Sequence, residues 1–322
     1  MNAHNSGEAL VTGSVIVGER QVEHLKQASL AVTWIKAPPS GTALCELVRG
    51  KSVYICGGRE LVDDQVVRAA SALKVIGFPG SGYTEFIPGW EEATRRGIPI
   101  VTAVGMNAPA VAEYAITLML AMLRRVPEQA RLGSLVTEPT REISGLTLAI
   151  IGLGRSGVAT AKLGKALGMR VLGVSRSMTE NPEVQVATLQ EALQNADIVS
   201  LHVDRINGRA VLGRDELKHL RPGALVVNVA FPDAIVWSAL RQEIETGRLR
   251  AAYDAPPEGE YADLSPERFF ASARQTAFNT REANTRAGDH IVAAVLEVLR
   301  AGTSPAVVNP DFQKFRARGP IP

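Results

Sequence analysis

The chain reads LTLAIIGLGRSG from Leu146 to Gly157. The first half of this stretch is typical of a buried strand, and a helical pattern from Val158 to Leu167 follows the glycines. In the context of strand, glycine turn and helix, the spacing G-x-G-x-x-G predicts a dinucleotide-binding loop. The first glycine permits the turn, the second lets a pyrophosphate approach the backbone, and the third lets helix and strand pack closely. The residues assigned to this loop are Gly152, Gly154, Arg155, Ser156 and Gly157.

Short apolar runs alternate with helical stretches on both sides of the glycine loop. Strands alternating with helices predict parallel sheets that are covered by helices on both faces. We therefore expect an α/β protein with two Rossmann-like, doubly wound parallel-sheet domains, the second of which binds the cofactor. Before the loop, strands are predicted at 14–17, 30–34, 52–56, 73–77 and 98–101, and a long apolar helix at 110–125. After it, strands are predicted at 170–174, 198–201, 224–228 and 249–253, and the last helix at 284–300.

The composition of the 322 residues is that of an ordinary globular protein, with 46% hydrophobic residues, 21% charged residues and a net charge of +2. Scattered basic residues give no support for nucleic-acid binding. The apolar helix carries Glu113 and is too short to span a bilayer, so no membrane partner is expected. Cys45 and Cys56 lack metal-ligand spacing and are typical of buried thiols in a reducing compartment. With no signal peptide recognised at the N-terminus, the sequence predicts a cytoplasmic protein without a metal site.

Further motifs flank the glycine loop in a fixed order. They are Gly80-Ser81-Gly82-Tyr83, Asn107-Ala108-Pro109-Ala110-Val111-Ala112-Glu113, Ala196-Asp197-Ile198-Val199-Ser200-Leu201-His202 and Leu220-Arg221-Pro222-Gly223-Ala224-Leu225-Val226-Val227-Asn228. Together they resemble the motifs of the D-isomer-specific 2-hydroxyacid dehydrogenase family, over about residues 45–310. Each motif alone is weak evidence, whereas all of them in this order are strong evidence.

The resemblance implies a formate/glycerate dehydrogenase-like architecture with a cleft between two domains. A substrate domain would comprise residues 1–108 and 284–322, and a dinucleotide-binding domain residues 109–283. It also implies a homodimer through the dinucleotide-binding domains and a small-molecule substrate. Asp254 corresponds to the aspartate that holds the nicotinamide carboxamide, and Ala230 either flanks the nicotinamide ring or is a plain core alanine. By the same resemblance His202 and Val229 line the cofactor, and Arg59, Gly80, Ser81 and Gly82 the substrate.

The end of the second strand after the loop indicates which dinucleotide is preferred. NAD-binding sites usually place an acid there, which accepts hydrogen bonds from the ribose 2′-hydroxyl. This chain instead has Ser175-Arg176-Ser177. The serines can donate to a 2′-phosphate and Arg176 can pair with it through two hydrogen bonds, which favours NADP(H), with NAD(H) as the alternative. The other interpretation is that Arg176 stacks on adenine or is simply exposed to water.

The residues that perform catalysis in the family are replaced. The family's arginine, which binds the substrate carboxylate, corresponds to Phe231, and its proton-donating histidine to Phe278, or to Asn279 after a slip of one residue. The glutamate that orients the histidine corresponds to Gly259, beside Glu258. An apolar pocket cannot bind a carboxylate as the family does. The phenylalanines therefore indicate either a more apolar substrate or a site without hydride transfer.

Other side chains are candidates for the proton donor. These are Tyr83 on the substrate loop, Tyr114 at the start of the long apolar helix, and Glu258. The leading hypothesis is an NAD(P)-dependent oxidoreductase that acts on a substrate other than a simple 2-oxo acid. One alternative is a cofactor-binding sensor or partner protein without redox turnover. Another is an enzyme that uses the cofactor for a redox-neutral step such as an elimination.

Overall fold

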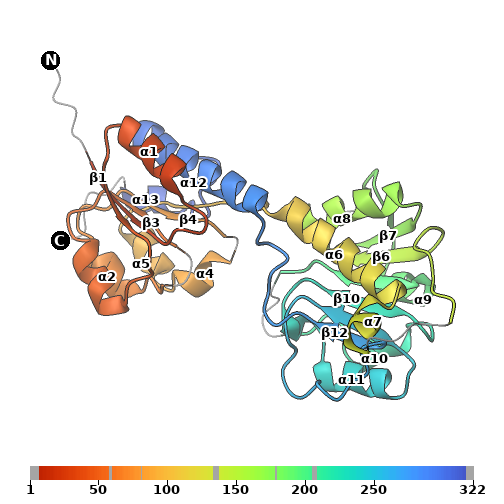
Figure 1. The fold of residues 1–322 in the computed structure, drawn as a ribbon. Coiled ribbons are helices and arrows are strands. Elements are labelled where there is room, and N and C mark those ends of the chain that lie inside the picture. The colour runs from red at the N-terminus through yellow and green to blue at the C-terminus, as the bar shows by residue number, and fades with distance from the viewer. Residues whose placement is uncertain are drawn as a thin grey trace. The chain divides into compact units, whose positions relative to one another are not determined.

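The computed structural model describes residues 7–57, 60–80, 82–132, 138–177, 180–204 and 209–316. The chain folds into two compact units: unit 1 is Met1–Asn107 with Arg281–Pro322, and unit 2 is Ala108–Thr280 (Figure 1). Each unit is built around its own parallel sheet. This confirms the predicted α/β class with two doubly wound domains.

Unit 2 contains a sheet of parallel strands: β6 (Thr147–Ile151), β7 (Arg170–Val174), β8 (Gln185–Val186), β9 (Ile198–Leu201), β10 (Leu225–Asn228), β11 (Arg250–Tyr253) and β12 (Phe269–Ala271). Their order in space is β12-β11-β10-β9-β6-β7-β8. From β6 the chain proceeds outward through β7 and β8, and then returns to β9 on the other side of β6. The carboxyl ends of β6 and β9 therefore form the topological switch point, where open α/β sheets bind their ligands.

Helices cover both faces of this sheet. They are α6 (Ala108–Leu123), α7 (Val126–Leu132), α8 (Arg155–Ala166), α9 (Leu189–Asn195), α10 (Arg214–Lys218) and α11 (Trp237–Glu245), with a 3-10 turn, η1 (Pro232–Ala234). Leu148 and Ile150 of β6 pack against α6 and α8, whereas Ala149 and Ile151 pack on the face covered by α9, α10 and α11. Burial on both faces explains why the strand is apolar throughout. Among the described helices, none combines the length and the apolar composition needed to cross a bilayer.

Unit 1 is a second doubly wound sheet, made of β1 (Glu8–Thr12), β2 (Ala31–Ile35), β3 (Val53–Ile55), β4 (Val75–Phe78) and β5 (Ile100–Thr102). The strands are parallel and lie in the order β2-β1-β3-β4-β5. The helices are α1 (Glu19–Gln27), α2 (Gly41–Leu47), α3 (Asp64–Ala69), α4 (Tyr83–Phe86), α5 (Trp90–Arg95), α12 (Arg281–Ala301) and α13 (Phe312–Arg316). In this unit the switch point lies between β1 and β3.

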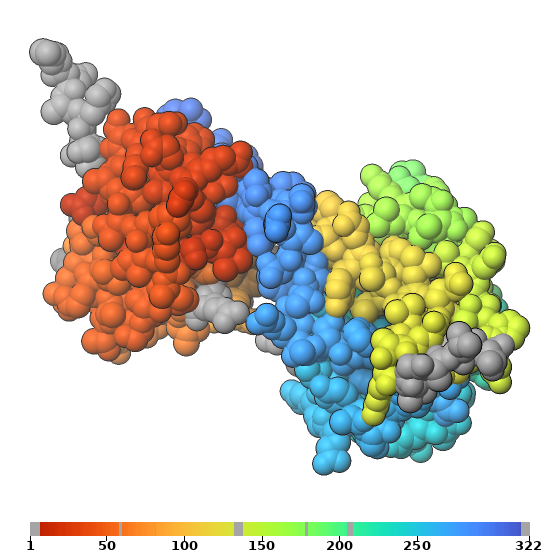
Figure 2. Space-filling model, viewed as in Figure 1, coloured from red at the N-terminus to blue at the C-terminus, as the bar shows by residue number. Residues whose placement is uncertain are grey.

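The C-terminal helix α12 completes the core of the N-terminal part of the chain. Its residues Ile291 and Val295 pack with Val22 and Leu25 of α1 on one face of the unit 1 sheet. The blue surface of α12 and the red surface of the N-terminal residues adjoin within this unit (Figure 2). Helices α2, α3 and α5 cover the opposite face. The apolar residues on the α12 face are therefore buried only when the two parts of the chain pack together.

One strand prediction is wrong, because residues 14–17 form a bend and not a strand. The strand lies earlier, at Glu8–Thr12, where it pairs with both β2 and β3. Gly13 ends it with a φ of +75°, in the left-handed region, and its carbonyl accepts a hydrogen bond of 2.8 Å from the Trp34 indole. The apolar residues after it serve packing instead: Val17 is buried against α12, while Val15 remains 69% exposed.

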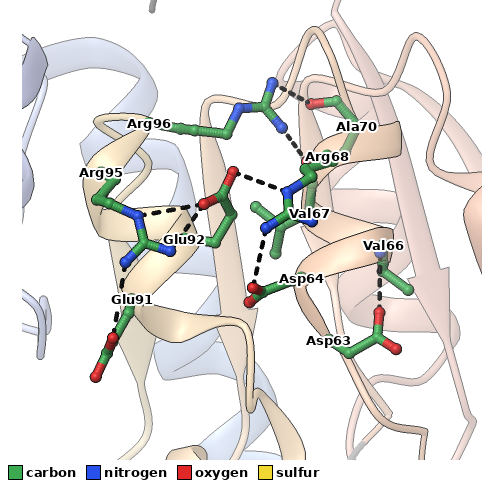
Figure 3. Close-up of polar contacts among 10 residues, drawn as sticks. All are labelled: Asp63, Asp64, Val66, Val67, Arg68, Ala70, Glu91, Glu92, Arg95 and Arg96. Carbon is green, nitrogen blue, oxygen red and sulfur yellow. Dashed lines mark hydrogen bonds and ion pairs between the residues drawn. The ribbon is translucent and has the colours of Figure 1, made fainter.

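Ion pairs connect the two short helices on the outer face of unit 1. Arg68 of α3 pairs with Asp64 at 3.1 Å and reaches Glu92 of α5 at 3.3 Å (Figure 3). Arg95 binds the same Glu92 at 2.9 Å and Glu91 at 3.7 Å. Although burial opposes it, hydrogen bonds from Arg95 and Arg68 lower the pKa of Glu92. Glu92 therefore joins α3 to α5 across the surface of the unit.

Side chains fill the switch point of unit 1. A Cβ on Gly57 would lie 2.7 Å from the Thr12 carbonyl oxygen, so the ends of β1 and β3 are in contact. The carboxylate of Glu60, which is 4% exposed, accepts hydrogen bonds at Oε1 from the Gly57 amide (2.7 Å), the Tyr54 hydroxyl (2.9 Å) and the Thr12 hydroxyl. Burial alone would raise the pKa of Glu60, but these hydrogen bonds outweigh it and lower the pKa below its usual 4.5.

We predict that Glu60→Gln destabilises the protein at neutral pH by about 1–3 kcal/mol, because buried donors lose a charged acceptor. The folded-state pKa of Glu60 is lowered, so its contribution is complete above the unfolded-state value and disappears as pH falls through the folded-state value. The difference between wild type and variant should therefore shrink below about pH 4. Urea denaturation at a series of pH values measures this difference in the free energy of unfolding.

Glu91→Gln is the matched control, since the Glu91 side chain is 64% exposed and its change should stay within about 0.5 kcal/mol. A destabilisation by Glu60→Gln that is equal at pH 7 and at low pH would show that the carboxylate is not ionised in the folded protein.

Candidate functional site

Two glycines of the loop after β6 are required by close backbone contacts. Gly152 has a φ of +99°, and a Cβ there would overlap the carbonyl oxygen of His202 at the end of β9. A Cβ on Gly157, in the first turn of α8, would overlap the carbonyl oxygen of Gly152. Helix α8 therefore approaches the end of β6 as closely as the backbone allows. Both positions exclude any residue with a side chain.

Gly154 is required for a different reason. Its φ of −71° suits any residue, and a Cβ built there meets no heavy atom of the described chain within 4 Å. It is the N-cap of α8, and no side chain among the described residues caps that helix end. The first amides of a helix need a partner, and together with the helix dipole they form a site for an anion. The open space at Gly154 fits the pyrophosphate of a dinucleotide.

His202 lies beside this loop and is neutral. It is 8% exposed, and burial lowers its pKa to about 3. Its Nε2 lies 3.0 Å from the Ser200 hydroxyl, while Nδ1 has no hydrogen-bond partner among the described residues. A histidine that stays neutral throughout the physiological range cannot act as a cationic phosphate ligand or as an imidazolium acid. Its carbonyl, against Gly152, makes it part of the wall of the switch point.

The three residues after β7 lie where the ribose of a dinucleotide is expected. Ser175 is half-buried, while Arg176 and Ser177 are exposed. The Ser177 amide lies 3.4 Å from the Ser175 hydroxyl, which holds the turn. Arg176 has no hydrogen bond or ion pair among the described residues, so its guanidinium is available to a ligand.

Asn228, at the end of β10, shapes the next loop along the sheet. Its Nδ2 donates to the Phe231 carbonyl (2.9 Å), and its Oδ1 accepts from the Ala230 amide (3.0 Å). These two bonds fix the turn that presents the half-buried Ala230 and Phe231, after the buried Val229. Sequence reasoning used Asn228 only as a marker of the strand and missed this positioning role.

Asp254 anchors the loop after β12. Its Oδ1 accepts from the Thr276 amide (2.9 Å) and hydroxyl (3.2 Å), and its Oδ2 accepts from the Ala277 amide (2.9 Å). Burial raises the pKa of Asp254, although these hydrogen bonds partly offset that effect. The structure thus gives Asp254 a contact that the sequence did not predict, in addition to the carboxamide role that the resemblance implies.

Strand β12, which the sequence analysis did not predict, ends at Ala271, and the loop 272–280 follows it. Ser272 hydrogen-bonds to the Tyr114 hydroxyl at 2.5 Å, and its amide donates to the Tyr253 carbonyl at 3.0 Å. Further along, the Gln275 Nε2 lies 3.4 Å from the Ala230 carbonyl oxygen. Phe278 is 39% exposed. Gln275 of this loop therefore reaches the turn of Asn228 and Phe231.

The remaining candidates are dispersed. Glu258 is exposed in the loop after β11. Tyr83 belongs to unit 1, where its ring packs edge-on against Trp90 and burial raises the pKa of its hydroxyl. Gly80 and Gly82 also belong to unit 1, whereas Arg59 and Ser81 lie outside the described residues. Within the part of the chain that the structure describes, no group of histidine, cysteine or acidic residues could hold a metal ion.

Known proteins are similar to this chain in sequence and in fold. The family model described as "D-isomer specific 2-hydroxyacid dehydrogenase, NAD binding domain" matches residues 116–271. D-3-phosphoglycerate dehydrogenase of Archaeoglobus fulgidus is 30% identical over 92% of this chain, which spans 60% of that protein's length. Glyoxylate reductase of Thermofilum pendens is 29% identical, with 87% of each chain covered. The NAD+-bound 3-phosphoglycerate dehydrogenase of Entamoeba histolytica shares the fold, with a TM-score of 0.80, 22% identity and coverage of 94% of this chain and 98% of its own.

We predict opposite effects for alanine at two glycines of the loop. Gly154→Ala should leave the free energy of unfolding within about 0.5 kcal/mol, because its Cβ meets open space. It should weaken dinucleotide binding by about tenfold or more, because the methyl group occupies the place of the pyrophosphate. Gly157→Ala should instead destabilise the fold by about 1–3 kcal/mol. Fluorescence titration with NADPH and urea denaturation measure the two quantities.

The pair contains its own control, since both variants add the same methyl group to the same loop. Undiminished NADPH affinity in Gly154→Ala would contradict the placement of the pyrophosphate.

Proposed function

The chain belongs to the D-isomer-specific 2-hydroxyacid dehydrogenase family, and on this basis we propose that it is a nicotinamide-dinucleotide-dependent oxidoreductase. The observation that carries the proposal is the open N-terminus of α8 at Gly154, at the switch point between β6 and β9. The names of the relatives, dehydrogenase and reductase, support redox turnover over binding alone. The chain spans 60% of the length of the first of these relatives.

In the proposed mechanism the residues of unit 2 hold the dinucleotide along the carboxyl edge of the sheet. When bound, the reduced dinucleotide supplies a hydride to the substrate. The amides at the start of α8 receive the pyrophosphate, with Gly154 leaving the space for it. Asn228 fixes the turn at Ala230, and by the family resemblance Ala230 would flank the nicotinamide ring. His202, neutral and buried, closes the wall behind the loop and takes no part in proton transfer.

We propose a substrate that is less anionic than a simple 2-oxo acid. The half-buried Phe231 stands where the family has its carboxylate-binding arginine, on the turn that Asn228 holds. An aromatic ring cannot donate the two parallel hydrogen bonds with which arginine binds a carboxylate. The exposed Phe278 adds a second apolar surface in the loop after β12. A neutral carbonyl compound with an apolar group fits these side chains better than glyoxylate does.

Steady-state assays test this function. With NADPH or NADH present, we expect kcat/KM for aromatic aldehydes or aliphatic ketones to exceed that for glyoxylate and hydroxypyruvate by about tenfold or more, a difference of about 1.4 kcal/mol. Phe231→Arg should shift this ratio toward glyoxylate, because it restores a carboxylate ligand.

Fast turnover of glyoxylate by the wild type would overturn the substrate proposal while supporting the enzyme. Tight dinucleotide binding without turnover of any carbonyl compound would instead favour a cofactor-binding sensor or a redox-neutral enzyme.

We further propose that NADP(H) is preferred over NAD(H). The exposed, unpaired Arg176 and the hydroxyl groups of Ser175 and Ser177 follow β7, where an acid would repel a 2′-phosphate. Arginine matches the geometry of phosphate and remains charged at all working pH values.

We predict that Arg176→Asp lowers the ratio of NADPH to NADH affinity by at least about tenfold, since hydrogen bonds to charged groups contribute about 1.5–3 kcal/mol. Arg176→Lys, which keeps the charge and loses the paired hydrogen bonds, should have an intermediate effect. Arg300→Asp is the charge-matched control, because Arg300 is exposed in the last turn of α12 in unit 1. An unchanged affinity ratio in Arg176→Asp would refute the NADP(H) assignment.

The oligomeric state and the cellular location of the protein are also inferred from the family resemblance and the sequence. We propose a homodimer formed through the dinucleotide-binding units. These units carry apolar surface, since Pro127, Leu264 and Phe270 line a hollow of about 420 Å³ between α7 and the segment 261–271. Val126, at the start of α7, is 51% exposed. A cytoplasmic location also stays a prediction from the sequence.

A further inference from the structure

The loop after β12 is held at both ends by side chains from elsewhere in unit 2. At its start, the Ser272 hydroxyl bonds to Tyr114 of α6 at 2.5 Å. At its end, the carboxylate of Asp254, 1% exposed, binds the amides of Thr276 and Ala277 at 2.9 Å each. A surface loop without such contacts would sample many backbone conformations, at a cost of about 1–2 kcal/mol per residue to fix. Only three residues, 273–275, lie between the two anchors.

Gln275 is the polar side chain that this clamped segment brings to the neighbouring loop. Its Nε2 lies 3.4 Å from the Ala230 carbonyl oxygen, one residue from Phe231. Both loops follow the carboxyl ends of strands of one sheet, the edge at which such sheets bind ligands. The amide has two N–H donors, and at most one of them serves Ala230. The side chain is exposed, so its second N–H can reach a ligand.

We propose that Gln275 is the hydrogen-bond donor to the substrate oxygen, a neutral replacement for a proton donor. This inference rests on the proposed function. During reduction the dinucleotide would lose a hydride and become oxidised, and a C–H bond would form at the carbonyl carbon. The π electron pair would move to the oxygen, which takes its proton from water. The Gln275 amide stabilises the negative charge that develops on that oxygen and keeps its own protons.

With Gln275 as the donor, Tyr114 and Phe278 have roles other than those expected from the sequence. Tyr114 becomes a positioning residue, because its hydroxyl is engaged with Ser272 and sets the start of the loop. Phe278, on the far side of the Asp254 anchor, contributes apolar surface and does not occupy the place of the proton donor. A neutral donor also suits a neutral substrate, because no charge needs to be compensated in the bound ground state.

Substitutions of Gln275, measured with the best carbonyl substrate and NADPH, test the proposal. Gln275→Ala should lower kcat by about 10²-fold, the usual loss when one oxyanion donor is removed. It should also weaken binding of a carboxamide analogue of that substrate by about tenfold, which fluorescence detects without turnover. NADPH affinity should stay within about twofold. Gln275→His should retain activity and acquire a pH dependence with a pKa near 6.5, absent from the wild type.

Matched variants separate this role from a general loss of structure. Gln129→Ala removes an exposed amide that donates to the Arg124 carbonyl at 2.9 Å, and should change nothing. Ser272→Ala should lower kcat by releasing the loop, while Ser272→Thr, which keeps the hydroxyl, should restore it. Wild-type turnover with an unchanged kcat in Gln275→Ala overturns the assignment of Gln275 alone. Absence of turnover in the wild type overturns the proposed function and this inference with it.

Discussion

The close approach of α8 to the end of β6 is the constraint on which unit 2 depends. The Gly157 α-carbon lies so near the Gly152 carbonyl that no side chain fits between them. This contact directs the amino end of α8, with the positive end of its dipole, toward the switch point of the sheet. It also positions Gly154 at the rim, where the absence of a side chain leaves room. The binding site follows from the packing of backbone on backbone before any polar side chain takes part.

The switch point of the sheet is open in unit 2 and filled by side chains in unit 1. In unit 2 the switch point stays open because glycines line it, and its one buried histidine is neutral. In unit 1 the corresponding place is filled by Glu60, whose carboxylate ties β1 to β3 through Thr12 and Gly57. A filled switch point stabilises its sheet, whereas an open one binds a ligand there. The similarity of the two folds therefore does not imply two nucleotide sites.

The sequence predicts those features that depend on neighbours along the chain. The glycine loop is such a feature, since its three glycines and flanking strand and helix lie within one short segment. The strand at Glu8–Thr12 was missed because its pairing with β2 and β3 decides it, while the more apolar 14–17 packs against α12. Strand β12 is as short as β3 and β5, which the sequence does predict, but it lies at the edge of the sheet, pairs only with β11 and is only partly buried. Because β12 was not predicted, the sequence alone could not place the loop that carries Gln275 beside the other loops at this edge of the sheet.

The anchor at Asp254 also lies close, along the chain, to the end of unit 2. Its last hydrogen bond reaches Ala277, and α12, which begins at Arg281, already belongs to unit 1. Only residues 278–280 lie between Ala277 and that helix, and among them the Asn279 amide donates to the Thr276 carbonyl at 2.9 Å. The loop that carries Gln275 is therefore hydrogen-bonded almost up to the first residue of α12, so a substitution in this short connection would act within a few residues of the Gln275 side chain.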